Sequence, residues 1–184
     1  MVEKITEKNT FTYSDYAQWE TDERYELIDG KPYAMGSPTP RHQRIIRELL
    51  VRLYDFLKGK PCEVFSSPLD VRLNFDKKDD TVVQPDIMVI CDQNKIDDKS
   101  VKGAPDLVVE ILSPSNIRFD FLVKHNKYFE AGVPEYLIVD PEEKMVHVFI
   151  LQNENYIVKL YGDTDTLPSH ILKDCNINLN EIFI

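Results

Sequence analysis

DLVVEIL, residues 106–112, is an aliphatic run that contains one charge, Glu110, and VVQPDIMVI, residues 82–90, places Asp86 in a similar setting. Runs of β-branched and aliphatic residues bounded by Pro, Gly and Asp are typical of buried strands. A charged side chain in such a strand is costly unless it is paired or bound to a cation. Two carboxylates on neighbouring strands therefore suggest a divalent metal between them, and hydrolytic chemistry.

The rest of the chain predicts one long helix, a group of strands, a second helix and more strands, which describes an α/β (mixed α+β) domain. Apolar residues at helical spacing over 40–58, followed by Gly59, predict a long amphipathic helix. A short helix over 14–20 would be capped by Ser14, and a hairpin over 25–35 would turn at Asp29-Gly30. We expect strands near 62–66, 69–75, 82–91, 106–112, 135–140, 145–151 and 155–160, a second helix near 117–130, and an irregular tail from 161 onward.

Length and composition indicate an ordinary globular protein. The chain has 184 residues, of which 42% are hydrophobic and 29% charged, and this fits a single domain over 1–184. No segment has the roughly 18 apolar residues of a membrane helix, and the N-terminus lacks a signal peptide, so a cytoplasmic protein without membrane contact is expected. Cys62, Cys91 and Cys175 are odd in number and widely spaced. They suggest a reducing compartment, with no disulfide framework and no zinc motif.

The net charge of −10 counts against a nucleic-acid partner, because phosphate binding favours a basic surface. A local basic patch can nevertheless coexist with an acidic remainder. Arg41, Arg44, Arg47 and Arg52 lie in the long predicted helix and would supply such a patch. The alternative, that they form the solvated face of an amphipathic helix, stays open.

Two Pro-Asp pairs, Pro85-Asp86 and Pro105-Asp106, have to be distinguished. Along a strand, Asp106 lies about 13 Å from Glu110, too far to share one ion with it. Asp86 lies on a different strand and can be level with Glu110 across the sheet. We therefore assign the metal role to Asp86 and expect Asp106 to mark a strand entry.

Glu110 has the parity of Val108 and Leu112, so all three point to one face of the strand. On an edge strand with that face in water, a glutamate would need no special role. Two carboxylates and a backbone carbonyl would suit Mg²⁺ or Mn²⁺, which prefer hard oxygen ligands and keep several waters.

Hydrolysis also needs a group that orients water or steadies charge on the leaving phosphate. Lys124 shares a helical face with Phe121 and Tyr128 and is drawn towards packed surface, whereas Lys127 is expected in solvent. The alternative for Lys124 is a surface pair with Asp120 at i,i+4. His42, in the first turn of the long helix, would be a capping or packing residue, or a catalytic one.

Glu26 has the parity opposite to Leu27 in the first hairpin and would face either a cleft or water.

The motifs of the chain, taken in sequence order, resemble those of the Uma2 family of restriction endonucleases, within the PD-(D/E)XK nuclease superfamily. The resemblance runs from about residue 11 to 160. The resemblance rests on YELIDG (25–30), Ser37-Pro38 with His42, QPDI (84–87), APDLVVEILSPS (104–115), Asp120 with Lys124 and Tyr128, and GVPEY (132–136) leading to Val139-Asp140-Pro141. It implies a restriction-endonuclease-like core, in which helices flank a central mixed β-sheet, with an added N-terminal helix and hairpin.

The resemblance also implies roles for individual residues. Asp86 would be the Pro-Asp carboxylate and Glu110 the carboxylate of the (D/E)-x-K element, with the backbone carbonyl of Ile111 as a third ligand. The position two after Glu110 is Leu112 and not lysine, so the lysine would come from the following helix as Lys124. Glu26 and His42 would contribute to the same catalytic site.

These expectations describe an endonuclease that hydrolyses DNA with Mg²⁺ or Mn²⁺ and a metal-activated water. One rival is a catalytically silent module that keeps the fold and binds DNA or a protein partner. Another is a hydrolase of RNA or of a different phosphoester. A homodimer is a further expectation, in which the apolar C-terminus IFI (182–184) would either seal an interface or pack on its own core.

Overall fold

The structure is a computed structural model that describes residues 9–113 and 119–183. Its larger sheet has six strands in the order β11-β10-β9-β8-β6-β3. All neighbours in this sheet are antiparallel except β8 and β9, which are parallel. The strands are β3 (Glu63–Ser66), β6 (Ile87–Ile90), β8 (Leu107–Ile111), β9 (Glu135–Asp140), β10 (Met145–Gln152) and β11 (Asn155–Gly162).

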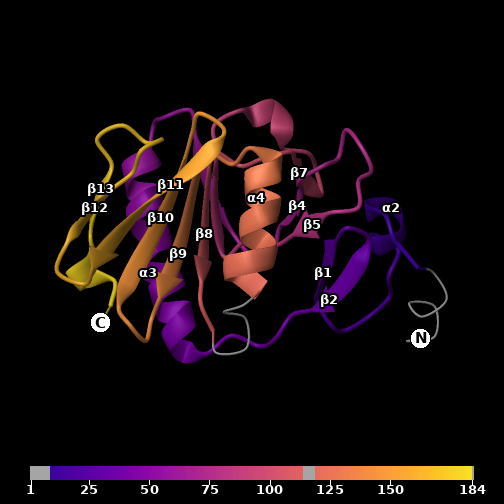
Figure 1. Cartoon of the computed structure of the whole chain (residues 1–184), viewed down its shortest axis with the longest axis horizontal. Helices are drawn as coiled ribbons and strands as arrows, with labels where there is room; N and C mark the ends of the chain where they lie inside the picture. Colours follow the sequence, from indigo (N-terminus) through magenta and orange to yellow (C-terminus); the bar gives the residue numbers. More distant parts are fainter. Residues whose placement is uncertain (1–8, 114–118, 184) are drawn as a thin grey trace.

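A smaller sheet of five strands, in the order β2-β1-β5-β4-β7, lies beside the larger one (Figure 1). It contains β1 (Tyr25–Ile28), β2 (Lys31–Ala34), β4 (Asp70–Arg72), β5 (Val82–Val83) and β7 (Ser100–Lys102). The expected hairpin is confirmed, since β1 and β2 pair through Asp29 and Gly30, both with positive φ. A side chain at Gly30 would also collide with Thr10, whose Cβ is 2.8 Å from an ideal Cβ built there.

Helices cover both faces of the six-stranded sheet, with α3 (Pro40–Leu57) behind and α4 (His125–Ala131) in front in Figure 1. Ile45, Leu49 and Leu53 of α3 pack in one core with the β8 residues Leu107 and Val109. The opposite face forms a second core, in which Tyr128 of α4 joins Val108 and Tyr136. The expected mixed class, with helices flanking a mixed sheet, is therefore confirmed.

The long predicted helix is also confirmed. It begins after Thr39, whose side chain accepts a hydrogen bond from the backbone N–H of His42, with Pro40 in its first turn. It ends at Leu57, just before Gly59 with φ +74°.

The prediction of one continuous strand over 82–91 is wrong, because this segment forms two separate strands. The chain leaves the smaller sheet after β5, crosses through Gln84, Pro85 and Asp86, and enters the larger sheet as β6. Proline has no N–H to donate, so a regular ladder cannot run through this position. The three crossing residues consequently lie between the two sheets.

Other boundaries differ from the expectations. The first helix is α2 (Tyr13–Tyr16), capped by Thr12 and not by Ser14, and the strand expected over 69–75 is limited to β4. The segment expected as one helix begins as a π-helix, η2 (Phe119–Lys124), and continues as α4. A short 3₁₀ helix, η1 (Gln93–Lys95), follows β6. Residues 117–118 lie outside the described part of the chain.

The tail from 161 onward is not irregular. It forms the two-stranded sheet of β12 (Thr166–Pro168) and β13 (Asn176–Asn178), followed by the 3₁₀ helix η3 (Leu179–Glu181). Ile182 is buried in the core on the α3 side and Phe183 packs against that core, while Ile184 is outside the described residues.

The expectation of no disulfide is wrong, because Cys62 and Cys91 are joined by one. Glu63 pairs with Ile90 in the β3–β6 ladder, so the next residue out on each strand brings the two cysteines face to face. This relation depends on strand register, which the spacing of the cysteines does not reveal. Cys175 is free and buried.

None of the helices in residues 9–113 and 119–183 has the length and apolar character needed to cross a lipid bilayer.

Candidate functional site

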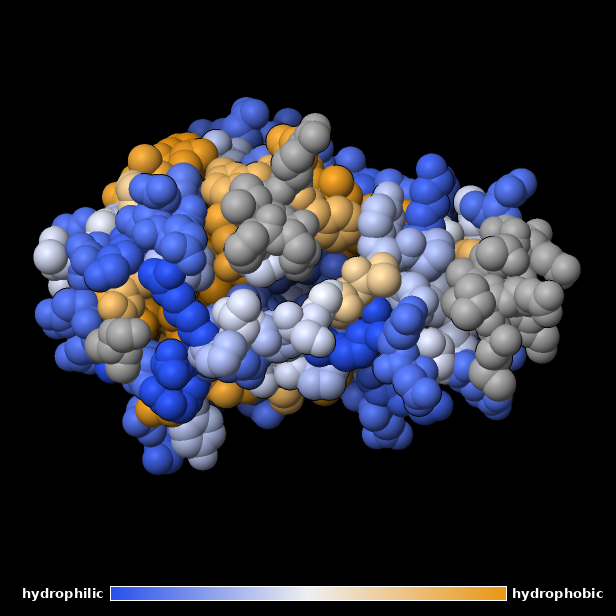
Figure 2. All heavy atoms as spheres, turned by 90° about the horizontal axis from the view of Figure 1, so that it is seen from below, coloured by the Kyte–Doolittle hydropathy of each residue, from blue (hydrophilic) through white to orange (hydrophobic). Residues whose placement is uncertain are grey.

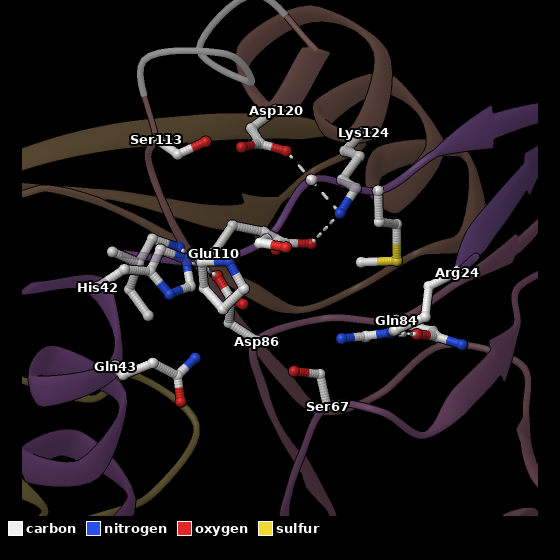
Figure 3. A pocket seen from close by; sticks show the side chains of 15 residues that line it. Arg24, His42, Gln43, Ser67, Gln84, Asp86, Glu110, Ser113, Asp120 and Lys124 are labelled. Carbon is white, nitrogen blue, oxygen red and sulfur yellow. Dashed lines mark hydrogen bonds and ion pairs between the residues drawn. The ribbon is translucent and has the colours of Figure 1, made fainter. Parts of the chain in front are cut away.

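A polar cavity of about 70 Å³ lies where the two sheets meet, with room for a few water molecules. Figure 2 shows a hollow near the middle of the face seen from below, with pale and blue surface along its lower edge in this view. The side chains around the cavity are drawn in Figure 3. Its polar lining consists of Arg24, Ser37, His42, Gln43, Ser67, Gln84, Asp86, Glu110, Ser113, Asp120 and Lys124.

Asp86 and Glu110 meet at one end of the β6–β8 pair. Ile87 pairs with Val109 in this antiparallel ladder, so one residue further places Asp86 opposite Glu110. Asp86 Oδ2 accepts the backbone N–H of Ile111 at 2.8 Å, which fixes its carboxylate against the end of β8. Both side chains line the same cavity, and neither points to the far face of the sheet.

Lys124 is the centre of a buried cluster of charges. Its Nζ lies 2.8 Å from Glu26 Oε1 and 2.9 Å from Glu110 Oε1, and it is 3.8 Å from Asp120 Oδ1. Glu26 also accepts the backbone N–H of Gln84 at 2.9 Å. The lysine thus ties β1 of the smaller sheet to β8 of the larger one.

The π-helix η2 brings Asp120 and Lys124 to the cavity. Asp120, Lys124 and Tyr128 are spaced by four residues and are 3%, 4% and 0% exposed. Tyr128 completes the environment of Glu110, because its hydroxyl donates to Oε1 at 2.6 Å. The alternative of a surface pair between Asp120 and Lys124 is therefore wrong.

His42 enters from the first turn of α3. Its Nε2 lies 3.1 Å from Asp86 Oδ2, and its Nδ1 is buried without a hydrogen-bond partner within the described residues. Burial lowers the pKa of His42, but hydrogen bonding and attraction to Asp86 outweigh it, so the pKa is raised above 6.5. His42 thus offers Asp86 a hydrogen-bond donor whose protonated form is favoured by the neighbouring carboxylate.

The surroundings of these side chains favour the protonated form of the carboxyl groups and the charged form of the lysine. Burial raises the pKa of Glu110 well above its usual value, and the nearby carboxylates add to the rise against the pull of Lys124. Burial likewise raises the pKa of Asp120, to about 7. Burial lowers the pKa of Lys124, but the surrounding carboxylates raise it by more, so the lysine stays protonated.

The donor set of this cavity fits a hard divalent cation only if the backbone takes part. Within the described residues, no three His, Cys, Asp or Glu side chains are grouped as a metal site. Asp86 and Glu110 offer carboxylate oxygens, the donors that Mg²⁺ and Mn²⁺ prefer, and Ile111, which also lines the cavity, would have to add its backbone carbonyl. The second oxygens, Asp86 Oδ1 and Glu110 Oε2, have no hydrogen-bond partner in residues 9–113 and 119–183. Four carboxyl groups lie around one lysine and one histidine, and a bound cation would favour their charged forms over their protonated ones.

Every predicted site residue is thus found at this cluster: Glu26, His42, Asp86, Glu110, Ile111 and Lys124. Lys127, expected in solvent, is instead partly buried and bridges Asp29 and Glu130. Asp106 accepts the backbone N–H of Cys91 at the start of β8, as a strand-entry residue would.

Sequence reasoning missed a second polar group on the opposite wall of the cavity. Gln84 Oε1 accepts from Arg24, at 3.1 Å to Nε and 2.6 Å to Nη2. Gln84 Nε2 donates to Asp70 Oδ1 at 2.9 Å and to the Tyr16 hydroxyl at 3.1 Å. A polar Gln84 directly before Pro85-Asp86, inside an apolar run, was the available signal.

Most arginines of α3 lie on the solvent-facing side of the helix, where they form ion pairs with glutamates. Arg41 pairs with Glu142 at 2.7 Å, and Arg52 bridges Glu48 and Glu181. Arg47 pairs with its neighbour Glu48. These pairs reduce the basic patch that the sequence suggested.

Comparisons with known proteins agree with this geometry. An uncharacterized protein of Synechocystis sp. (strain ATCC 27184 / PCC 6803 / Kazusa) is 28% identical over 157 residues, covering 83% of this chain and 81% of the relative. A crystal structure described as a putative nuclease belonging to DUF820, from Anabaena variabilis ATCC 29413, superposes with a TM-score of 0.77 at 20% identity. That match covers 94% of this chain and 97% of the other, and it shows a shared nuclease-like fold.

A family model with the description "Uma2: Putative restriction endonuclease" matches residues 13–180, nearly the whole chain. The chain therefore belongs to the Uma2 family, the family described as putative restriction endonucleases.

Proposed function

We propose that this protein is an endonuclease that hydrolyses DNA phosphodiester bonds with a divalent cation, Mg²⁺ or Mn²⁺. The observation that carries the proposal is the meeting of Asp86 and Glu110 across β6 and β8, beside a buried lysine. Family membership supports it, because the family description names restriction endonucleases. Fold alone would not suffice, since one fold hosts many activities.

Asp86, Glu110 and the backbone carbonyl of Ile111 would hold the cation. When bound, the cation supplies a water of lowered pKa and positive charge at the reacting phosphate. The remaining functions belong to the side chains of the chain itself.

Lys124 supplies a fixed positive charge for the phosphate undergoing attack. It takes the place of a lysine at Leu112, a residue that is buried in the core on the α4 side and cannot reach the cavity as a charged group. What matters for charge stabilisation is the position of the ammonium group and not its place in the sequence. Glu26 and Glu110 hold that group in place before substrate binds.

Glu26 and His42 act through their neighbours. Glu26 positions Lys124, and it is itself positioned by the Gln84 backbone. His42 orients Asp86 by contacting the same oxygen, Oδ2, that accepts the backbone N–H of Ile111. Both roles predict moderate losses of activity on substitution, smaller than those at Asp86.

A plasmid-nicking assay with Mg²⁺ or Mn²⁺ tests the proposal. Wild type should convert supercoiled to nicked DNA, and Asp86→Asn should reduce the rate by about a hundredfold or more. Asp106→Asn is the matched control, because it changes the other Pro-Asp carboxylate and leaves the cavity intact.

Equal nicking by wild type and Asp86→Asn would mean a contaminating nuclease. No nicking by wild type, with either cation, would refute the DNA endonuclease. In that case a panel of RNA and other phosphoesters would separate a different hydrolase from a silent binding module.

A further inference from the structure

We propose that Arg24 binds a phosphate group of the nucleic-acid backbone at the cavity, and that Gln84 is the residue that positions it. This rests on the proposed function only in taking the cavity to be the site where nucleic acid binds. Arg24 lines the cavity on the side away from His42 (Figure 3).

A chain of hydrogen bonds fixes the orientation of the Arg24 guanidinium, and in each bond the chemistry of the groups decides which one donates and which one accepts. Arg24 can only donate, so the oxygen of Gln84 must face it, at 3.1 Å from Nε and 2.6 Å from Nη2. The Gln84 nitrogen then faces Asp70, an acceptor, at 2.9 Å. Tyr16 supports this arrangement by donating to Asp70 at 3.1 Å and accepting from Gln84.

The charge of Arg24 is left for a ligand. Among the described arginines, Arg41, Arg47, Arg52 and Arg72 each pair with a glutamate or an aspartate, whereas Arg24 and Arg44 have no ion-pair partner within the described residues. Of these last two, only Arg24 lines the cavity. Arg24 has no carboxylate within ion-pair distance in the described part of the chain, although the protein has 32 acidic and 22 basic residues. A guanidinium held by a neutral amide keeps its full charge, and its planar set of donors suits a phosphate.

Gln84 also links Arg24 to the rest of the site. Its backbone N–H donates to Glu26, which holds Lys124, and its chain continues through Pro85 to Asp86. A phosphate bound by Arg24 would therefore lie beside the carboxylates without displacing Lys124. The positive charge would also offset the repulsion between an acidic cavity and a polyanion.

The test is fluorescence polarisation with a short fluorescein-labelled DNA duplex in EDTA, over a series of salt concentrations. Arg24→Ala should weaken binding about tenfold, and the slope of log affinity against log salt should fall by about 0.9. Arg24→Lys should restore part of the affinity. Gln84→Met, which cannot accept from Arg24, should weaken binding by less than Arg24→Ala with an unchanged salt slope.

Lys173→Ala is the matched control, because Lys173 is an exposed basic residue between β12 and β13 that does not line the cavity. It should bind DNA as wild type does. Arg24 is exposed, but Arg24→Ala leaves Oε1 of the buried Gln84 without its two hydrogen bonds, so thermal melting should show a cooperative transition with Tm lower by no more than about 5 °C. A loss of binding well below that transition would then not reflect unfolding.

The proposal is overturned if wild type does not bind the duplex, or if Arg24→Ala binds with the affinity and salt slope of wild type. The outcome is distinct from that of the nicking assay. Arg24-dependent binding without nicking would support the phosphate site and refute the endonuclease, whereas nicking with unaltered Arg24→Ala binding would do the reverse.

Discussion

Pro85-Asp86 and Pro105-Asp106 occupy equivalent places at opposite ends of one strand pair. Asp86 directly precedes β6 and accepts the N–H of Ile111, the last residue of β8, at 2.8 Å. Asp106 directly precedes β8 and accepts the N–H of Cys91, the residue after β6, at 2.7 Å. Because β6 and β8 are antiparallel, the same dipeptide makes the same local contact twice.

The two ends differ in what the rest of the chain brings to them. Asp86 meets Glu110, His42 and the cavity that holds Lys124. Beside Asp106, Cys91 is bonded to Cys62 instead. The local motif therefore sets the geometry of a carboxylate, and distant segments decide whether it can take part in chemistry.

The largest expected effect is a loss of thermal stability when the positive charge of Lys124, which lies at the Asp86 end, is removed. Lys124→Met leaves Glu26 and Glu110 buried without their cation, a cost of about 3 kcal/mol or more. For a chain of this size, Tm should fall by about 10 °C in a thermal melt at pH 8. Lys127→Met, on the same segment but with partly exposed partners, should lower Tm by no more than about 3 °C. Similar losses in both variants would contradict the central position of Lys124.

Divalent cations should stabilise one end of the strand pair and not the other. Mn²⁺ at a hundred times its dissociation constant adds about 2.7 kcal/mol, which raises Tm by about 5 °C or more. Differential scanning fluorimetry should show this shift in wild type and in Asp106→Asn. Its persistence in Asp86→Asn would place the cation elsewhere.

Asp120 should make stability depend on pH. Because burial raises its pKa in the folded state to about 7, above the 3.8 of an ordinary aspartate, the folded form favours the proton. Stability from this group is complete below pH 3.8 and is lost as pH rises through 7. Asp120→Asn should therefore gain stability relative to wild type from pH 5 to pH 8, by about 5 °C in Tm. A difference in Tm that stays constant with pH would show that Asp120 does not titrate in this range.

The smallest expected effect is the difference in stability between variants that remove the carboxylate of Asp106 and that of Asp86. Asp106→Ala loses the hydrogen bond that the Cys91 N–H donates to its charged carboxylate, about 1.5 kcal/mol, so Tm should fall by about 4 °C. Asp86→Ala should lose less, because removing its charge also relieves repulsion with Glu110 and Asp120. Equal losses, measured by urea denaturation, would mean that the two ends are electrostatically alike.

The sequence was sufficient for the parts of the fold that depend on local pattern. The periodicity over 40–58 predicted α3, and Asp29-Gly30 predicted the hairpin, because both signals lie within a few residues. The split at Pro85 was missed, because the apolar run continues on both sides of it and only the tertiary structure assigns the halves to different sheets. The Cys62–Cys91 disulfide was missed for a similar reason, since it depends on register.

The candidate site shows the same division. The alternation of side chains along β8 predicted that Glu110 lies on the same face as Val108. The separation of the two strands in sequence predicted that Asp86 can lie level with Glu110, and the β6–β8 register agrees. The burial of Asp120 and the position of Arg24 were not predictable from spacing. Each depends on packing between segments far apart in the chain.

The wide turn of η2 makes this protein unusually sensitive to changes in length at one place. A π-helix closes i→i+5 hydrogen bonds where an α-helix closes i→i+4, so deleting one residue between 120 and 124 would tighten η2 towards an α-helix and turn Asp120 relative to Lys124. Lys124 and Tyr128 would keep the spacing of four residues at which both are buried. Insertions and deletions in related chains should therefore avoid this short interval.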